Sequence, residues 1–196
     1  MAPVVILVRH GETEWTLSGQ HTGRTDIPLT ENGRAQAREL SAELADRKFA
    51  LVLSSPLSRA LDTCRLAGFG DQVQTTDDLV EWDYGEYEGM TTPEIRSGRK
   101  RWSLWMDGAP GGETPADVGL RVDRVVTELR EVMADTEADV AVFGHGHVLR
   151  VLTARWLGLT PADGRLFALD PATFSLLGYE RENSVIRRWN DPVGAP

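Results

Sequence analysis

The chain has 196 residues, of which 41% are hydrophobic and 26% are charged, and its formal net charge is −9. This length suits one domain with a well-filled core, and the composition is that of a globular protein rather than a disordered or fibrous one. The acidic balance argues against a nucleic-acid partner, because no dense basic face compensates for repulsion of the phosphate backbone. A small anion remains compatible, since two or three converging cations create a local potential that outweighs a distant acidic surface.

Cys64 is the only cysteine, which excludes an intramolecular disulfide, a dithiol redox pair and a multi-thiolate metal site. The apolar residues 3–8 are too few to cross a bilayer, and they lack the basic flank and cleavage site of a secretory signal. We therefore expect a cytoplasmic protein without membrane association.

Strand and helix signals alternate along the chain. Val4–Val8 is an unbroken aliphatic run, typical of a strand that is buried on both faces of a parallel sheet. Thr30 precedes a run of helix formers over 31–47, and a second strand is predicted at 49–55. In the helix that follows, Ser55 is expected to cap and Pro56 to take the first helical position.

The second half of the chain repeats the signal. Thr114 and Pro115 begin a predicted helix that extends to 135, and a strand starting at 139 leads into another helix that ends near 158. Two late segments, 173–180 and 184–190, are predicted as closing strands or an edge hairpin. This alternation predicts an α/β fold, in which a mostly parallel sheet lies between helices.

Residues 82–112 interrupt the alternation with a stretch rich in glycine and aromatic residues that has no clean periodicity. Irregular insertions in α/β domains often cover a functional site. No repeat or linker divides the chain. We therefore expect a single domain over 1–196, with a substrate-covering insertion at about 82–112.

Unusual side chains follow three of the predicted strands. Arg9 and His10 follow the first strand, Arg59 lies in the first turn after the second, and His145 and His147 follow a later one. Each alone fits a solvent-exposed arginine or a structural histidine. In open α/β sheets, however, the carboxyl ends of the strands and the following helix N-termini form the ligand crevice. Arginines, histidines and helix N-termini gathered there would attract an oxyanion, and phosphate is the obvious candidate.

A metal site is the alternative for the histidine pair. His145 and His147 are two residues apart and could face one ion, but such a site needs a third ligand, usually a carboxylate. The sequence has no HExxH motif, cysteine cluster or dense His/Asp motif, and it lacks the nucleotide motifs GxxxxGK[ST] and GxGxxG. We therefore predict neither a metal nor another cofactor.

Five segments in one order carry a resemblance to a known family: "LVRHGETEW", "SSPLSRALDT", "EWDYGEYEG", "PGGET" and "FGHGHVLR". From Val4 to about Leu157 the chain resembles the histidine phosphatase superfamily, which includes the cofactor-dependent phosphoglycerate mutases. The RHG triplet alone is weak evidence, whereas five motifs in one order are specific. The resemblance implies a three-layer α/β/α sandwich of the phosphoglycerate mutase type and a phosphohistidine intermediate.

The resemblance also implies roles for individual residues. His10 would be the nucleophile, and Arg9, Arg59 and His145 would surround the equatorial phosphate oxygens, where fixed donors stabilise the charge of the transition state. His10 must be neutral to attack, and the neighbouring cations are expected to hold its pKa down. Glu81 would protonate the leaving oxygen and then, as a carboxylate, activate water.

Other positions match the family less specifically. Asp83, Glu86 and Glu88 compete with Glu81 for the role of proton donor, and only the position in the motif favours Glu81. Thr16 and His147 stand where many members have other residues, an asparagine at the first position and a small or amide residue at the second. The residues expected to bind substrate are Thr16, Thr22, Gly23, Tyr84, Gly146 and His147.

The same catalytic set serves phosphatases and mutases, so the insertion must decide between them. A mutase needs several extra cations in a closed lid that shields phosphohistidine from water, and the mutases that resemble this chain carry a longer insertion. The insertion here has a basic run, which could equally be a solvated face, and three apolar residues expected to make the mouth of the pocket partly apolar. These residues are Arg96, Arg99, Lys100 and Arg101 in the basic run, and Trp102, Trp105 and Met106.

The insertion is more similar to acid phosphatases and sedoheptulose bisphosphatase-like enzymes than to mutases. We expect a metal-independent phosphatase that acts on small phosphorylated metabolites such as sugar phosphates. The alternatives are a 2,3-bisphosphoglycerate-dependent phosphoglycerate mutase and, from another class, a non-catalytic module that binds phosphorylated ligands. An exposed sheet edge, or Trp102 and Trp105, could also support a homodimer.

Overall fold

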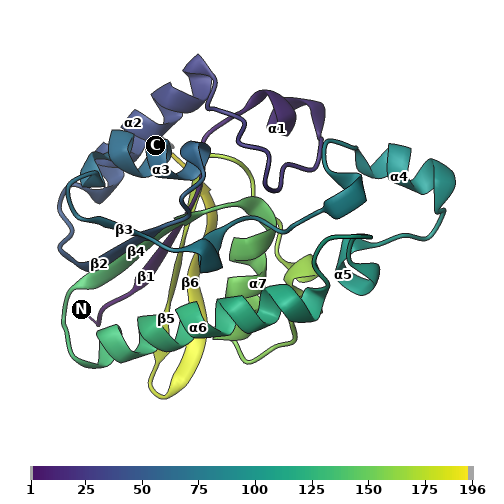
Figure 1. Ribbon diagram of the computed structural model, residues 1–196. Helices are drawn as coiled ribbons and strands as arrows, with labels where there is room; N and C mark the ends of the chain where they lie inside the picture. Colours follow the sequence, from purple (N-terminus) through teal and green to yellow (C-terminus); the bar gives the residue numbers. More distant parts are fainter. Residues whose placement is uncertain (1, 194–196) are drawn as a thin grey trace.

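The computed structural model describes residues 2–193 and contains a six-stranded sheet between two layers of helices (Figure 1). The strands β1 to β4 pair in parallel, whereas β5 and β6 are antiparallel. The predicted mostly parallel sheet is therefore confirmed, and so is the closing hairpin. The strands lie in the order β3-β2-β4-β1-β5-β6, and their bounds are β1 Val5–Arg9, β2 Phe49–Ser54, β3 Val73–Thr75, β4 Asp139–Gly144, β5 Thr173–Glu180 and β6 Asn183–Pro192.

Helices cover both faces of the sheet because the side chains of each buried strand alternate between two apolar clusters. Along β1, Ile6 and Val8 belong to the cluster of α2 (Glu31–Leu44) and α3 (Ser58–Cys64). Val5 and Leu7 belong to the cluster of α6 (Pro115–Ala134) and α7 (Gly146–Trp156). Figure 1 shows these two helix pairs on opposite sides of the sheet. The arrangement is the three-layer α/β/α sandwich that the resemblance implies.

The starts of the helices follow the capping signals in two of three cases. The Thr30 hydroxyl accepts from the Gly33 N–H at the start of α2, and Thr114 caps α6 with Pro115 as its first residue. The expected start of α3 at Pro56 was wrong, because α3 begins at Ser58. The Ser55 hydroxyl lies 2.8 Å from the Nε2 atom of His145, so it holds another element instead of capping a helix.

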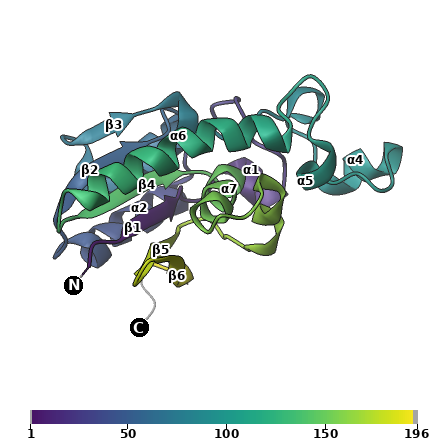
Figure 2. The same cartoon turned by 90° about the horizontal axis from the view of Figure 1, so that it is seen from below.

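The stretch 82–112 holds three short helical elements: η3 (Gly85–Tyr87), α4 (Thr92–Gly98) and α5 (Leu104–Asp107). Figure 2 shows α4 and α5 extending beyond the end of the sheet. Trp82 and Leu104 in this stretch are buried in the cluster that contains α6 and α7. Helices of four to seven residues are too short to give a readable helical period, which explains the absence of a signal in the sequence.

The remaining short elements connect the layers. None of the helices within residues 2–193 has both the length and the apolar character of a bilayer-spanning segment. The connecting elements are α1 (Glu14–Ser18), the π-helical turn η1 (Arg65–Phe69), and the 3₁₀ turns η2 (Asp77–Leu79) and η4 (Pro161–Leu166).

Candidate active site

Three neighbouring strands bring the candidate residues to one edge of the sheet. β2, β4 and β1 are adjacent and parallel, so their carboxyl ends lie side by side. Arg9 ends β1 opposite Gly144, and the His10 N–H donates to the Gly144 carbonyl at 3.0 Å. The rings of His10 and His145 are 5.2 Å apart between centroids. The residues that the sequence places after three separate strands therefore lie together in space.

His10 is held as a neutral imidazole with a free Nε2. Its Nδ1 lies 2.8 Å from the Gly11 carbonyl, which can only accept, so the proton is on Nδ1 and the lone pair is on Nε2. Burial lowers the pKa of His10 well below its usual range, and the charges of Arg59 and Arg9 lower it further. The sequence predicted the effect of the arginines, but burial is the larger cause.

Arg9 presents a buried donor without a partner. One guanidinium nitrogen, Nη1, donates to the Leu169 carbonyl, whereas Nε is buried and makes no hydrogen bond to the described residues 2–193. Buried donors are normally paired, so this N–H fits a bound oxyanion. A Cβ at Gly146 would lie 3.2 Å from the Arg9 Cζ, which explains why glycine suits the N-terminus of α7 here.

Arg59 is fully buried and organises the loop at residues 22–25. Its Nη1 donates to the Thr25 carbonyl at 3.0 Å, and Nη2 donates to the carbonyls of Gly23 at 2.8 Å and Thr22 at 3.1 Å. Its Nε lies 3.1 Å from the Nδ1 atom of His145. Four of its five N–H donors are thereby used; the second hydrogen of Nη1 makes no hydrogen bond to residues 2–193, and the Asp26 carboxylate forms an ion pair with Nη1 at 3.9 Å.

His145 is also fixed in one tautomer. Because Nδ1 must accept from Arg59, the proton is on Nε2 and is donated to the Ser55 hydroxyl at 2.8 Å. Burial lowers the pKa of His145 well below its usual range, so the ring is neutral. The sequence analysis missed Ser55 as part of this cluster. Its position directly after a buried strand, at the edge that carries the other candidates, was the available signal.

Thr63 joins the loop of His10 to α3. Its hydroxyl accepts from the Gly11 N–H at 3.2 Å and donates to the Arg59 carbonyl at 2.7 Å. This residue was also missed, because a threonine inside a helix has no motif of its own. It links the backbone positions of the proposed nucleophile and the proposed phosphate clamp.

Glu81 lies against the N-terminus of α7. Its Oε1 accepts from the Val148 N–H at 2.8 Å and the Trp82 N–H at 2.9 Å, and its Oε2 accepts from the His147 N–H at 2.8 Å. Three backbone donors, two of them from the first turn of α7, therefore fix the position of the carboxyl group. Two of the competing carboxylates act elsewhere, since Asp83 pairs with Arg24 and Glu88 accepts from the N–H groups of Gly23 and Thr25.

The sequence of the chain matches the profile of a known family. The sequence profile of the histidine phosphatase superfamily (branch 1) matches residues 5–192. The chain belongs to the histidine phosphatase superfamily. The fold expectation is likewise confirmed by a solved structure, of the product of an open reading frame from Mycobacterium tuberculosis, which superposes with a TM-score of 0.92 at 38% identity and covers 98% of this chain and 99% of its own.

Curated relatives of this histidine phosphatase include phosphatases and mutases. It is 42% identical over 179 residues to an acid phosphatase of Mycobacterium tuberculosis, covering 90% of this chain and 86% of the relative. It is 37% identical to a sedoheptulose 1,7-bisphosphatase of Saccharomyces cerevisiae, over 81% of this chain and 69% of the relative. It is 34% identical to a 2,3-bisphosphoglycerate-dependent phosphoglycerate mutase of Gloeobacter violaceus, over 81% of this chain and 77% of the relative.

The predicted substrate-binding residues of this histidine phosphatase divide into two groups. The buried Tyr84 and the partly buried His147 form a pair beside Glu81, in which the Tyr84 hydroxyl lies 2.6 Å from the His147 Nδ1. Burial raises the pKa of Tyr84 well above its usual range and lowers the pKa of His147 well below its own, so the phenol donates and the imidazole accepts. Gly23 lies close to this pair, because a Cβ there would be 3.0 Å from the Tyr84 ring.

The hydroxyls of Thr16 and Thr22, which were also predicted to bind substrate, form hydrogen bonds to nearby backbone groups. The Thr16 hydroxyl accepts from the Thr13 N–H at 2.9 Å and donates to the Thr13 carbonyl at 2.8 Å, which closes the capping box of α1. The Thr22 hydroxyl donates to the Gln20 carbonyl at 3.2 Å, and its carbonyl accepts from Arg59. A substrate contact from either hydroxyl would compete with these bonds.

The basic run of the histidine phosphatase is a solvated face. Arg96, Arg99, Lys100 and Arg101 are all exposed, and Arg99 pairs with Asp107 at 2.8 Å. The expectation that Trp102 lines the mouth was wrong: the indole is 2% exposed and donates to the Gly108 carbonyl at 2.9 Å. Its size and its N–H partner make it a core residue.

Trp105 differs from Trp102, because it is only half-buried and lies near the proposed substrate groups. Its ring centroid is 5.2 Å from that of His147, and the Arg150 guanidinium lies over it at 4.5 Å. Met106, in contrast, is 71% exposed.

His145 and His147 do not face a common point, since His145 binds Arg59 and Ser55 whereas His147 binds Tyr84. Within the described part of the chain, no group of three or more His, Cys, Asp or Glu side chains is placed to hold a metal ion.

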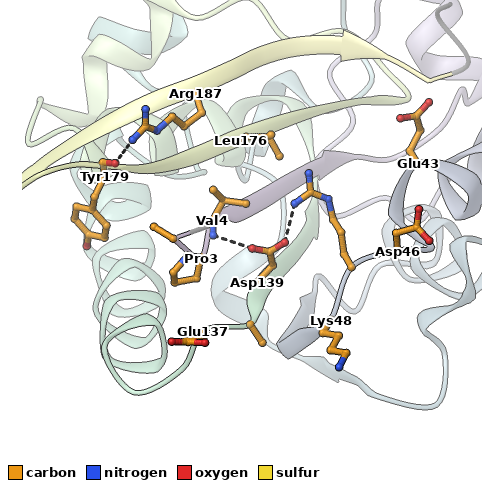
Figure 3. A pocket seen from close by; sticks show the side chains of 13 residues that line it. Pro3, Val4, Glu43, Asp46, Lys48, Glu137, Asp139, Leu176, Tyr179 and Arg187 are labelled. Atoms are coloured by element: carbon orange, nitrogen blue, oxygen red, sulfur yellow. Dashed lines mark hydrogen bonds and ion pairs between the residues drawn. The ribbon is translucent and has the colours of Figure 1, made fainter.

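A cavity of about 940 Å³ opens at the opposite edge of the sheet, near the amino ends of β1, β2 and β4 (Figure 3). Its charged side chains have both signs, and two of its three cations are engaged. Arg47 pairs with Asp139 at 2.7 Å, and Arg187 donates to the Tyr179 carbonyl. The cavity therefore lacks the converging free cations that a phosphate requires, and the carboxyl-end cluster remains the candidate site.

Proposed function

We propose that this histidine phosphatase hydrolyses phosphomonoesters of small metabolites, sugar phosphates among them, through a phosphohistidine at His10. The observation that carries the proposal is the neutral His10 imidazole, with its proton fixed on Nδ1 and its Nε2 free, in the field of the buried Arg59 and the partly buried Arg9. A nitrogen nucleophile needs that lone pair, and the phosphate needs those cations.

In the first step, the His10 Nε2 attacks phosphorus, and the bond from phosphorus to the leaving oxygen breaks. The free Nε–H of Arg9 and the remaining Nη1–H of Arg59 bind equatorial oxygens. His145 keeps the Arg59 guanidinium in place through Nδ1, and a bond from its Nε2–H to a phosphate oxygen would have to compete with the present bond to Ser55. Glu81, protonated in the complex, gives its proton to the leaving alcohol.

In the second step, the Glu81 carboxylate takes a proton from a water molecule whose oxygen attacks phosphorus. The bond between phosphorus and Nε2 breaks, and its electron pair returns to His10. Inorganic phosphate is released, and Glu81 is again the acid for the next cycle. The bonds to the N-terminus of α7 suit the carboxylate half of this cycle, because they stabilise the anion.

Hydrolysis is favoured over phosphoryl transfer between two positions of one substrate. A mutase must exclude water and bind a second phosphate with further cations. In this chain the basic run of the insertion is exposed, and the interior of the insertion is filled by Trp82, Tyr84 and Trp102. The insertion therefore supplies aromatic packing rather than cationic binding.

We further propose that the reaction needs no metal or other cofactor, which the separate hydrogen-bond partners of His145 and His147 support. A cytoplasmic location is supported by the single, buried Cys64, and the net charge of −9 argues against a nucleic-acid partner. A homodimer would use an exposed sheet edge, because Trp102 is buried within the protein.

The test uses purified protein treated with a chelator. The protein is incubated with an aryl phosphate, with a panel of sugar phosphates, and with 3-phosphoglycerate in the presence and absence of 2,3-bisphosphoglycerate, and phosphate release and isomerisation are measured. Phosphate release from the esters is expected, together with an acid-labile phosphoenzyme that His10→Ala abolishes. Isomerisation of phosphoglycerate much faster than phosphate release would favour the mutase. Binding without turnover would favour the binding module, and full activity of His10→Ala would exclude the mechanism.

A further inference from the structure

A buried ion pair joins the start of α6 to the loop that precedes it. The Arg121 Nε lies 2.7 Å from the Glu113 Oε1, and Nη2 lies 3.0 Å from Oε2, so the pair is bidentate. The two side chains are 9% and 17% exposed. Neither residue belongs to the candidate site described above.

The remaining donors of Arg121 bind the backbone that leads to Glu81. Its Nη1 donates to the carbonyls of Val80 at 2.7 Å and Asp78 at 2.8 Å, and its Nη2 donates to the Glu81 carbonyl at 3.3 Å. The guanidinium thus contacts three carbonyls at and before Glu81. Since residues 80–84 form no helix or strand, they have no regular backbone ladder to fix them.

Glu113 binds the same segment on the other side of Glu81. Its Oε2 accepts from the Asp83 N–H at 2.9 Å, and its carbonyl accepts from the Trp82 indole N–H at 2.8 Å. The Glu113 N–H donates to the Asp83 carbonyl at 2.9 Å. The pair therefore clamps the chain both before and after Glu81.

We propose that the Arg121–Glu113 pair is a positioning device for the Glu81 carboxyl in the protonation of the leaving oxygen. A general acid must lie within hydrogen-bond reach of the atom that it protonates, and a displacement of about 1 Å is costly. The N-terminus of α7 holds the carboxyl end of Glu81, and the Arg121–Glu113 pair holds its backbone. This inference rests on the proposed function, because it assigns Glu81 the role of acid.

A purely structural role predicts a different result. Breaking a buried ion pair lowers stability, which would reduce activity equally for every substrate. Misplacing an acid affects substrates unequally, because an alkyl alcohol must receive a proton as it leaves whereas a nitrophenol can leave as the anion. The value of kcat/KM reports this step, since it covers events up to departure of the leaving group.

The experiment compares kcat/KM of wild type and Arg121→Lys for nitrophenyl phosphate and an alkyl phosphate at one pH. We expect the variant to lose about tenfold or more with the alkyl ester and less than about threefold with the nitrophenyl ester, within the range of general acid catalysis. The matched control is Arg124→Lys, one turn further along α6. Arg124 binds the Asp78 carboxylate from an exposed position, so its replacement should leave the ratio unchanged.

A double variant tests whether Arg121 acts through Glu81. In a Glu81→Gln background the acid is absent, so Arg121→Lys should add less than about twofold to the loss with the alkyl ester. Equal losses for both esters in the single variant, or additive losses in the double variant, would overturn the proposal. If Arg121→Lys does not fold, as thermal unfolding would show, Glu113→Gln replaces it with the same expectations. Failure of the proposed function is distinct, because wild type would then hydrolyse neither ester.

Discussion

The reactivity of His10 depends on a proton that its surroundings place on one nitrogen. The Gly11 carbonyl holds that proton on Nδ1, and the Gly11 N–H is in turn bound by Thr63. Thr63 also binds the carbonyl of Arg59. The orientation of the proposed nucleophile, His10, is therefore coupled to the position of the proposed phosphate clamp, Arg59, by one hydroxyl.

Replacing Thr63 by valine tests this coupling. The methyl group keeps the shape, but the buried Gly11 N–H loses its acceptor, so the free energy of unfolding should fall by about 1–3 kcal/mol. Activity should fall as well, because the loop that orients His10 is released. Urea unfolding and hydrolysis of an aryl phosphate measure the two effects. Thr63→Ser keeps the hydroxyl and should retain activity; equal behaviour of the two variants would contradict the coupling.

The residue types at the candidate site could be predicted, but most of their partners could not. The motifs place Arg9, His10 and Arg59 at strand ends, and the parallel pairing of β1 and β4 brings His145 to them. Ser55 is 90 residues from His145, and although its position after a buried strand places it at the right edge of the sheet, the residue type does not identify its partner. The same holds for Thr63, because hydroxyl pairing depends on tertiary geometry.

At the scale of elements, the loop that follows β1 and carries His10 packs against α2 through two glycines. A Cβ on Gly11 would lie 2.4 Å from the Gly33 carbonyl oxygen, and a Cβ on Gly33 would lie 2.2 Å from the Glu12 carbonyl oxygen. Both distances are impossible for a real side chain without movement of the backbone. The approach of α2 to the loop therefore depends on the absence of side chains at both positions.

Gly33→Ala should push α2 away from the loop that carries His10. We expect the free energy of unfolding to fall by about 1–3 kcal/mol, as for other overpacked positions, and kcat/KM to fall with it. Gly98→Ala, in α4, is the control, since a Cβ there meets nothing within 4 Å. That variant should be neutral or more stable by up to about 1 kcal/mol. Chemical denaturation of the Gly33→Ala and Gly98→Ala variants measures both free energies of unfolding. Equal values for the two variants would contradict the packing argument.

The sequence predicts long elements better than short ones. The strands β1, β2 and β4 are unbroken apolar runs, the helices α2, α6 and α7 have apolar stripes long enough to read, and α2 and α6 also have capping threonines. The start of α3 was misplaced because a Ser-Pro pair usually marks a helix start, whereas Ser55 here serves His145. The insertion has no readable period because its order comes from buried indoles and from the contacts of Arg121 and Glu113.

At the scale of the whole molecule, all four histidines are neutral rings; His10 and His145 are buried, and His21 and His147 are partly buried. Burial lowers the pKa of His21 to about 4 and lowers the pKa values of His10, His145 and His147 well below their usual range. Above about pH 6.5 these rings are neutral in both the folded and the unfolded chain. Below that pH, the unfolded chain binds protons that the folded protein does not, so acid favours unfolding.

We therefore expect the free energy of unfolding to decrease as the pH falls below about 6.5, by up to about 1.4 kcal/mol per pH unit for each neutral histidine. The contribution of His21 should end near pH 4, where its folded form is also protonated. Urea unfolding at several pH values measures the slope. His21→Asn should reduce the slope of the unfolding free energy against pH by the contribution of one histidine. A free energy of unfolding that stays constant from pH 7.5 to 5.5 would disprove this account.

The position of β1 within the sheet has a consequence for biosynthesis. β1 pairs with β4 and β5, which lie at Asp139–Gly144 and Thr173–Glu180, so it acquires both neighbours only after these distant segments have been synthesised. Until then an apolar segment with free backbone edges is exposed, as in other folds with distant strand pairing. The strand that supports the proposed nucleophile thus remains incompletely paired until β5 is made, and a nascent chain that stops before β5 cannot complete the sheet around His10.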